Sequence, residues 1–461
     1  MDELTLRPAT ELAALLRGGQ ISARELTEAH IAAVERHNPT INAIVTFTPD
    51  RALARARELD AAMARGDVLG PLHGLPVAHK DLQETRGVRT TYGSPLHADF
   101  VPDFDSLLVE RMRDAGAISL GKTNVPEFGA GSQTFNPVFG ATRNPHDLTK
   151  TVGGSSGGAA AALACGMVAL ADGSDMGGSL RNPASFCGVV GLRPSAGRVP
   201  RHPASMGWFE LSVDGPLGRT VGDVALLLSA IAGPDDSDPI ALPQPGSSFA
   251  APLDRDLRGL RVAWTDGLGL PYDPAVLAVY HAARARFEAM GCAVSDATPD
   301  MAEADFVFAT LRAWSFHAGM AETLRLHRDK LKATIVGNIE AGGRLSGADI
   351  AEAERQRTTL YHKLRAFFAD YDCLVLPTVQ VPPFAVACEY PTEIAGTPMG
   401  SYIDWMRSCS WISACGLPAI SVPCGATSDG LPIGLQIVGR YRDDWGLLQV
   451  AHAFEREGGG G

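Results

Sequence analysis

The sequence has 461 residues, enough to bury a large hydrophobic core in one large α/β domain or in two to three smaller domains. Apolar residues make up 45% of the chain and charged residues 20%, a balance that excludes disorder over the whole length. The formal net charge of −12 repels nucleic acids and anionic membranes, and no basic run offsets it, so we expect neither as a partner.

The eight cysteines are scattered and form no CxxC pair, which argues against a zinc ribbon or a thioredoxin-like redox site. The first residues (MDELTLRPATELAALL) have no signal-peptide pattern, and no uncharged apolar run reaches the length of a membrane span. We therefore expect a cytoplasmic monomer or homodimer with no metal site and no cofactor. Residues 458–461 are four glycines, which we expect to form a tail outside the fold.

The N-terminal 69 residues have the periodicity of helices. Two helices are predicted within residues 8–37, and Ser22 followed by Glu25 is a capping-box pattern for the second. A third helix is predicted from Arg51 to Arg65 and ends at Gly66. We expect residues 1–69 to form a helical region that packs on the core.

Residues 70–235 are rich in glycine, and strand-like apolar runs alternate there with helical ones: PVAHK, LLVERMRDAG and AISLGK. This alternation is typical of βαβ units. The segment 158–170 begins as an alanine-rich helix, which is small enough to pack tightly on a sheet. The prediction is an α/β fold with a large central, mostly parallel mixed sheet covered by helices on both faces.

Residues 236–457 are expected to complete the same α/β domain. The segment 234–256 is rich in proline, serine and aspartate and is predicted to be a linker. Residues 303 to about 370 are mainly helical in pattern, and we interpret them as an insertion near the substrate entrance. Three buried strands follow (CLVLPTV, PAISVPCG and PIGLQIVG), and a helix at 447–454 ends the domain.

The stretch GGSSGG at 153–158 allows three interpretations. As a nucleophile elbow it satisfies G-x-S-x-G, but the preceding LTKTV is a poor strand and no HGGG-type segment is present. A His-dependent serine esterase using this loop remains an alternative function, although no pattern supports any candidate histidine: His202, His281, His317, His327, His362 or His452. A phosphate cradle would require a Gly-Lys-Ser/Thr ending, which is missing. The third interpretation is a loop that caps a helix.

A second loop, from Asp172 to Pro194, contains another glycine pair before a serine. Successive backbone N–H groups in such a loop can converge on one point and stabilise an oxyanion. The predicted donors are the N–H groups of Met176, Gly177, Gly178 and Ser179. Asp175 and Arg181 flank these residues with opposite charges and are expected to brace the loop.

Lys80 ends the apolar run PVAHK. A lysine is usually a solvated surface charge, but at the end of a buried strand desolvation lowers its pKa and lets it act as a base.

Taken together, GLPVAHKD, GGSSGG and GSDMGGSLRNPASFCGVVGLRPS resemble the amidase signature family in order and spacing. VDGPLGRTVGDVALLLSAIAG and GLPAISVPCG…GLPIGLQIVG extend the resemblance over nearly the whole chain. The resemblance implies the amidase signature fold, with residues 70–235 as its core, and a Ser-cisSer-Lys triad. Carried over by position, Ser179 is the nucleophile, Ser155 the bridging serine after a cis peptide bond, and Lys80 the base. Ser156, Asp175 and Arg181 would support this triad.

Some positions depart from the family pattern. His79 stands where the family more often has a small apolar residue, and is either a satisfied core imidazole or a modulator of the pKa of Lys80. Ser174, Met176 and Leu180 replace the commoner Thr, Thr and Ile and preserve size.

The resemblance implies an amidase that hydrolyses C–N bonds through a seryl acyl-enzyme, with side activity on esters and carbamates (urethanes). We expect small, largely uncharged substrates, including aryl amides, because the candidate pocket walls are apolar and the acidic insertion offers no evident site for an anion. The candidate walls are Gly129, Ala130 and Gly131, then Met206, Trp208 and Phe209, and also Trp314, Phe316, Tyr402 and Trp405.

Overall fold

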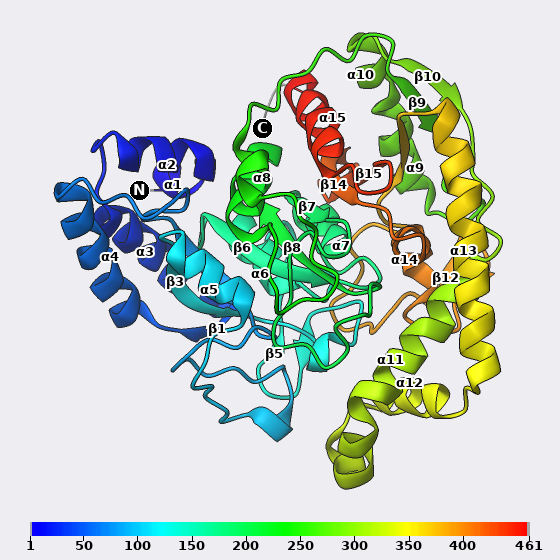
Figure 1. Cartoon of the computed structure of the whole chain (residues 1–461), viewed down its shortest axis with the longest axis horizontal. Coiled ribbons are helices and arrows are strands. Elements are labelled where there is room, and N and C mark those ends of the chain that lie inside the picture. The colour runs from blue at the N-terminus through cyan, green and yellow to red at the C-terminus, as the bar shows by residue number, and fades with distance from the viewer. Residues whose placement is uncertain (1, 459–461) are drawn as a thin grey trace.

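The computed structural model describes residues 2–458, in which one large sheet runs through the molecule (Figure 1). Its eleven strands lie in the order β1-β3-β2-β6-β8-β7-β14-β15-β11-β9-β10. Their bounds are β1 Ile44–Phe47, β2 Pro76–Lys80, β3 Ile118–Thr123, β6 Leu170–Asp175, β7 Val190–Arg193, β8 Val213–Gly218, β9 Arg261–Trp264, β10 Ala293–Asp296, β11 Cys373–Pro377, β14 Ala419–Ala426 and β15 Pro432–Val438. Two short hairpins join β4 Phe135–Asn136 to β5 Gly140–Ala141, and β12 Glu393–Ile394 to β13 Thr397–Pro398.

The predicted α/β class with one large mixed sheet is confirmed, but parallel pairs do not predominate. They form two blocks, one joining β2 to β3 and β6 and the other joining β9 to β10 and β11. The central strands β8, β7, β14 and β15 are antiparallel to their neighbours. The strands β14 and β15 are joined by a short turn at Gly430, and such a connection can only give antiparallel pairing.

Helices cover the sheet on both faces. The helices α6 and α7 contact each other on one face, and α8 and α15 do so on the other. No helix within residues 2–458 is long and apolar enough to cross a lipid bilayer. The helix bounds are α1 Asp2–Thr5, α2 Ala9–Arg17, α3 Ala23–Ile41, α4 Pro49–Ala64, α5 Leu107–Asp114, α6 Gly157–Ala164, α7 Arg181–Cys187, α8 Val221–Ile231, α9 Pro274–Ala282, α10 Arg284–Ala289, α11 Ala304–His327, α12 Ala333–Gly343, α13 Gly347–Asp370, α14 Arg407–Ala414 and α15 Asp444–Glu457.

The N-terminal helices lie at one end of the sheet, and α11, α12 and α13 lie at the opposite side (Figure 1). The predicted capping box at the start of α3 is present, because the Glu25 N–H donates to Ser22 Oγ at 3.1 Å and the Ser22 N–H donates to the Glu25 carboxylate at 2.8 Å. This region also contributes the edge strand β1, which helical periodicity does not predict. The glycine tail predicted at 458–461 lies outside the described residues except for Gly458, which caps α15.

The alanine-rich helix α6 packs against β6, β8, β2 and β3. Its side chains from Ala159 to Ala162 are fully buried, so only small residues fit between the helix and the sheet. Gly158 makes the closest approach, since a Cβ there would lie 2.4 Å from the backbone nitrogen of Asn124. This packing fixes the start of α6, and with it Ser155 and Ser156.

Gly158→Ala is therefore expected to lower the free energy of unfolding by about 1–3 kcal/mol, the usual cost of overpacking a core. The matched control is Gly319→Ala in α11, an exposed helical position where a Cβ would have no neighbour within 4 Å. That substitution should be neutral or stabilising by about 0.5–1 kcal/mol. Urea denaturation of both variants measures the difference, and equal stabilities would contradict the close approach of α6.

Candidate active site

The side chain of Lys80 ends β2 in the interior and is fully buried. Its amine nitrogen is surrounded by hydroxyl groups rather than by carboxylates. Lys80 Nζ lies 2.7 Å from Ser155 Oγ, 2.8 Å from Ser156 Oγ and 2.9 Å from Ser174 Oγ. The sequence does not identify Ser174 as a partner of the lysine, although the replacement of the commoner threonine by serine preserves the hydroxyl group at this position.

Burial lowers the pKa of Lys80 to about 7, against the opposing influence of the Asp214, Asp175 and Asp172 carboxylates. A substantial fraction of the side chain is therefore a neutral amine near pH 7. A neutral amine has two N–H donors and one lone pair, so with three hydroxyl neighbours it can donate to two and accept a proton from the third.

The GGSSGG loop contacts both Lys80 and the second loop. The bond between Gly154 and Ser155 is cis, as predicted. The Ser156 N–H donates to the carbonyl oxygen of Ser179 at 3.1 Å, which holds the two loops together. Ser156 occupies the N-cap position of α6, yet its side chain makes no capping hydrogen bond and contacts Lys80 instead.

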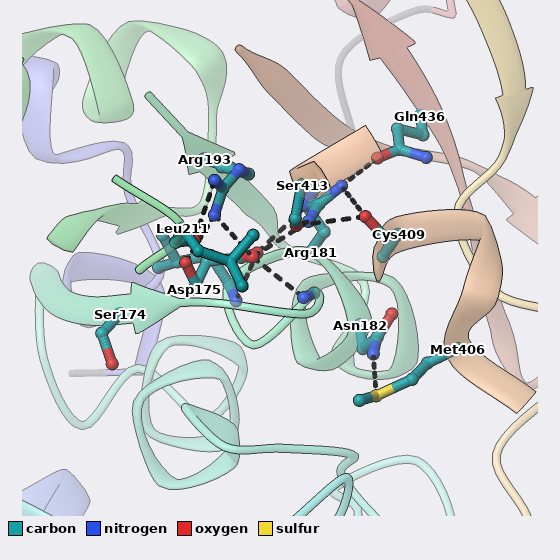
Figure 2. A network of polar contacts seen from close by, with 12 residues as sticks. Ser174, Asp175, Arg181, Asn182, Arg193, Leu211, Met406, Cys409, Ser413 and Gln436 are labelled. Carbon is teal, nitrogen blue, oxygen red and sulfur yellow. Dashed lines mark hydrogen bonds and ion pairs between the residues drawn. The ribbon is translucent and has the colours of Figure 1, made fainter. Parts of the chain in front are cut away.

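Asp175 organises the second loop (Figure 2). Its carboxylate accepts from the Gly178 N–H at 2.9 Å, the Leu180 N–H at 3.1 Å and Arg181 Nε at 3.0 Å. Burial raises the pKa of Asp175, but the guanidinium groups of Arg181 and Arg193 outweigh burial and hold that pKa well below its usual range. The expected brace is therefore an ion pair with both side chains completely buried.

The predicted oxyanion donors divide into two groups. The Gly178 N–H is directed to Asp175, which corrects its predicted role. Met176, Gly177 and Ser179 line a cavity, and no residue among 2–458 accepts a hydrogen bond from their N–H groups. Gly178 has φ +119°, and a Cβ there would lie 2.6 Å from the Cβ of Cys409, so the turn requires glycine.

The cavity has a volume of about 170 Å³ and brings together the predicted serines of both loops. A cavity of about 150 Å³ holds one benzene molecule, so this one accommodates an aromatic ring with a few further atoms. Its lining residues are Leu82, Phe128, Gly129, Gly131, Ser155, Ser174, Met176, Gly177, Ser179, Arg201, Ser212, Arg312, Phe316, Tyr402 and Met406.

Of the predicted walls, Gly129, Gly131, Phe316 and Tyr402 line the cavity. The others do not, for different reasons. Ala130 is buried against α12 and Trp208 is 78% exposed to solvent. Phe209 packs against Trp314, and Trp405 is stacked on Phe186. Met206 is half-buried outside the cavity.

The sequence does not identify Leu82, Phe128, Arg201, Ser212, Arg312 or Met406 as cavity residues. Leu82 follows Lys80 by two positions and Phe128 precedes Gly129, so proximity to predicted residues is an available signal for these two. Nothing in the local sequence marks Arg312. No histidine lines the cavity within the described part of the chain, so the histidine-dependent esterase receives no support from the geometry.

His79 has a hydrogen-bonded partner. Its Nδ1 lies 2.8 Å from Asp172 Oδ1, and the second oxygen of Asp172 accepts from the backbone N–H of Lys80 at 3.0 Å. This arrangement fits the interpretation of a satisfied core imidazole, and it ties the imidazole to the backbone of the lysine.

A buried amine, serine hydroxyls and an adjoining cavity define the class of acyl-transfer hydrolases. Comparisons with known proteins identify the family: Amidase matches residues 25–448. An acylamidase of Rhodococcus erythropolis is 38% identical and covers 97% of this chain and 94% of its own length. A glutamyl-tRNA(Gln) amidotransferase subunit from a Synechococcus strain is also 38% identical, with 96% and 94% covered.

Among solved structures, a bacterial aryl acylamidase of the amidase signature family superposes with a TM-score of 0.91 at 30% identity, and 98% of this chain and 96% of that one are covered. The chain therefore belongs to the amidase signature family, and is a hydrolase acting on amide C–N bonds.

If neutral Lys80 is the base, kcat/KM for a simple anilide such as 4-nitroacetanilide should rise with pH through about 7 and level off above it, because the protonated amine below that pH cannot accept a proton. Lys80→Met should lose about 10²–10⁴-fold in kcat/KM. A profile that is unchanged between pH 6 and 8, or a fully active Lys80→Met variant, would contradict the assignment.

Removing one member of the buried ion pair should be costly. Asp175→Asn leaves Arg181 and Arg193 without a counter-charge, and the expected loss is about 3–5 kcal/mol in the free energy of unfolding. The control is Asp256→Asn, which breaks an exposed pair with Arg258 and should leave stability unchanged within error. Thermal melting of the two variants tests this contrast.

Proposed function

We propose that the protein is an amidase that hydrolyses small amides, aryl amides among them, through an acyl-enzyme on Ser179. One observation carries the proposal: a buried lysine with a pKa of about 7 contacts Ser155, and Ser155 and Ser179 line the same cavity. A base, a relay hydroxyl and a nucleophile thereby adjoin a space that fits a substrate.

The proposed reaction begins when neutral Lys80 takes the proton of Ser155, which in turn takes the proton of Ser179. The Ser179 oxygen attacks the amide carbonyl. The N–H groups of Met176, Gly177 and Ser179 stabilise the oxyanion, since they have no other acceptor in the described chain. The proton then returns along the same relay to the leaving amine, and water hydrolyses the acyl-enzyme.

Ser156 and Ser174 have positioning roles in this scheme. Each holds Lys80 Nζ from a different side, so the lone pair of the neutral amine is directed to Ser155. Asp175 and Arg181 keep the second loop in the conformation that presents Ser179. None of these groups needs to change its protonation state during the reaction.

The walls of the cavity favour a partly apolar substrate of limited size. Leu82, Phe128, Phe316 and Met406 supply apolar surface, and the volume limits the substrate to about one ring and a short acyl group. The acylamidase and aryl acylamidase relatives are consistent with such substrates. Esters and carbamates present a similar carbonyl group, and we propose both as side activities.

We propose further that the chain acts on its own as a monomer or homodimer in the cytoplasm. All eight cysteines are unpaired, and only Cys388 is exposed, which suits a reducing compartment. The similarity to an amidotransferase subunit makes glutamine the natural counter-substrate for the test.

A fluorophosphonate probe followed by peptide mapping tests the nucleophile. The expected adduct is on Ser179, and Ser179→Ala should abolish both labelling and hydrolysis of small anilides. An adduct on Ser156 would instead support the nucleophile elbow, and a protein that releases ammonia from glutamine but cleaves no anilide would support the amidotransferase role.

A further inference from the structure

The guanidinium group of Arg312 lies in the wall of the catalytic cavity. Arg312 belongs to α11, which the sequence separates from both catalytic loops by more than a hundred residues. Its side chain is 5% exposed, and it lines the same cavity as Ser155 and Ser179. A cation is therefore buried beside the scissile site.

The partners of Arg312 are all uncharged. Nη1 donates to Asn338 Oδ1 at 2.7 Å, and Nη2 donates to the Tyr402 hydroxyl. The guanidinium carbon lies 4.4 Å from the ring centre of Phe316 and 5.5 Å from that of Tyr402. These contacts fix the orientation of the guanidinium without neutralising its charge.

The other buried arginines differ in this respect. Arg181 and Arg193 contact Asp175, and Arg198 contacts Asp444 at 3.0 Å. Even Arg201, which lines the same cavity, is paired with Asp214 at 3.2 Å. No carboxylate within residues 2–458 lies within 4.0 Å of the Arg312 guanidinium.

Buried charges in proteins are normally paired, because an isolated charge is costly to remove from water. We propose that the missing partner of Arg312 is a carboxylate of the substrate, so that the enzyme prefers small amides carrying one carboxylate group. This inference rests on the proposed function and specifies its substrate class. It also revises the expectation of an uncharged substrate, because the sequence does not show that Arg312 lines the cavity.

The size of the cavity limits where the carboxylate can stand. With about 170 Å³ available, the carboxylate and the scissile carbonyl must be only a few bonds apart, as in the half-amide of a short dicarboxylic acid or an acylated aminobenzoate. A guanidinium held by Asn338 and Tyr402 is preorganised to bind such a group through charge-assisted hydrogen bonds.

Two matched pairs of substrates test the inference. The first pair carries the carboxylate on the acyl side: the 4-nitroanilide of succinic acid against that of butanoic acid. The second carries it on the amine side: 4-acetamidobenzoate against 4-acetamidotoluene. The wild-type protein should favour the acidic member of at least one pair in kcat/KM.

Arg312→Met should lower kcat/KM for the favoured acid by about 10–100-fold, the range expected for charged hydrogen bonds, and should change the neutral partner by less than about threefold. Arg312→Lys should restore part of the preference. Arg325→Met is the control, because Arg325 is an exposed residue of the same helix that pairs with Glu322, and it should affect neither substrate. Equal losses on acid and neutral substrates in Arg312→Met would overturn the inference.

A binding measurement needs no change at Arg312. Calorimetric titration of Ser179→Ala with 4-acetamidobenzoate, 4-acetamidotoluene and the two 4-nitroanilides should show tighter binding of the acidic member of a pair, and equal or weaker binding of both acids would overturn the inference even if Arg312→Met did not fold. If the wild-type protein hydrolyses none of the four amides, the proposed function fails. If it hydrolyses the neutral amides without any preference for the acids, only the role of Arg312 fails.

Discussion

The burial of the Lys80 amine among hydroxyl groups is the constraint on which the rest of the site depends. An ammonium group without a carboxylate partner is poorly stabilised in the interior, and its pKa falls to about 7 as a result. The fold holds three serine hydroxyls within 2.9 Å of the nitrogen, which is enough to solvate it but not enough to keep it fully protonated. A lysine on the surface would not have this property.

Keeping Lys80 buried requires the neighbouring elements to be rigid. The tight packing of α6 fixes Ser155 and Ser156 on one side of the amine, and the Asp175–Arg181 pair fixes the second loop on the other. Arg181 is itself held by the carbonyl of Cys409, the hydroxyl of Ser413 and the side chain of Gln436 (Figure 2). The second loop is therefore anchored by α14 and β15, which lie more than 200 residues later in the chain.

The same cavity combines two kinds of electrostatic environment. Around Lys80 the protein supplies neutral hydroxyls and suppresses the positive charge. Around Arg312 it also supplies neutral partners, but a guanidinium cannot lose its proton near neutral pH. One cation therefore becomes a base and the other keeps its charge.

Local patterns in the sequence are enough to identify the residues of the short motifs: the capping box at Ser22, the strand ending in Lys80, and the two glycine-serine loops with Ser155 and Ser179. The resemblance to a family assigns their roles. The packing of distant elements is needed to bring Lys80 into contact with Ser155, 75 residues away, to direct the Gly178 N–H to Asp175, and to place Arg312 in the cavity wall. It also sets the antiparallel centre of the sheet and the choice of aromatic side chains that face the substrate. The physical reason is that a helix such as α11 has no local signal for the side chain that will face a cavity formed mainly by residues 82–212.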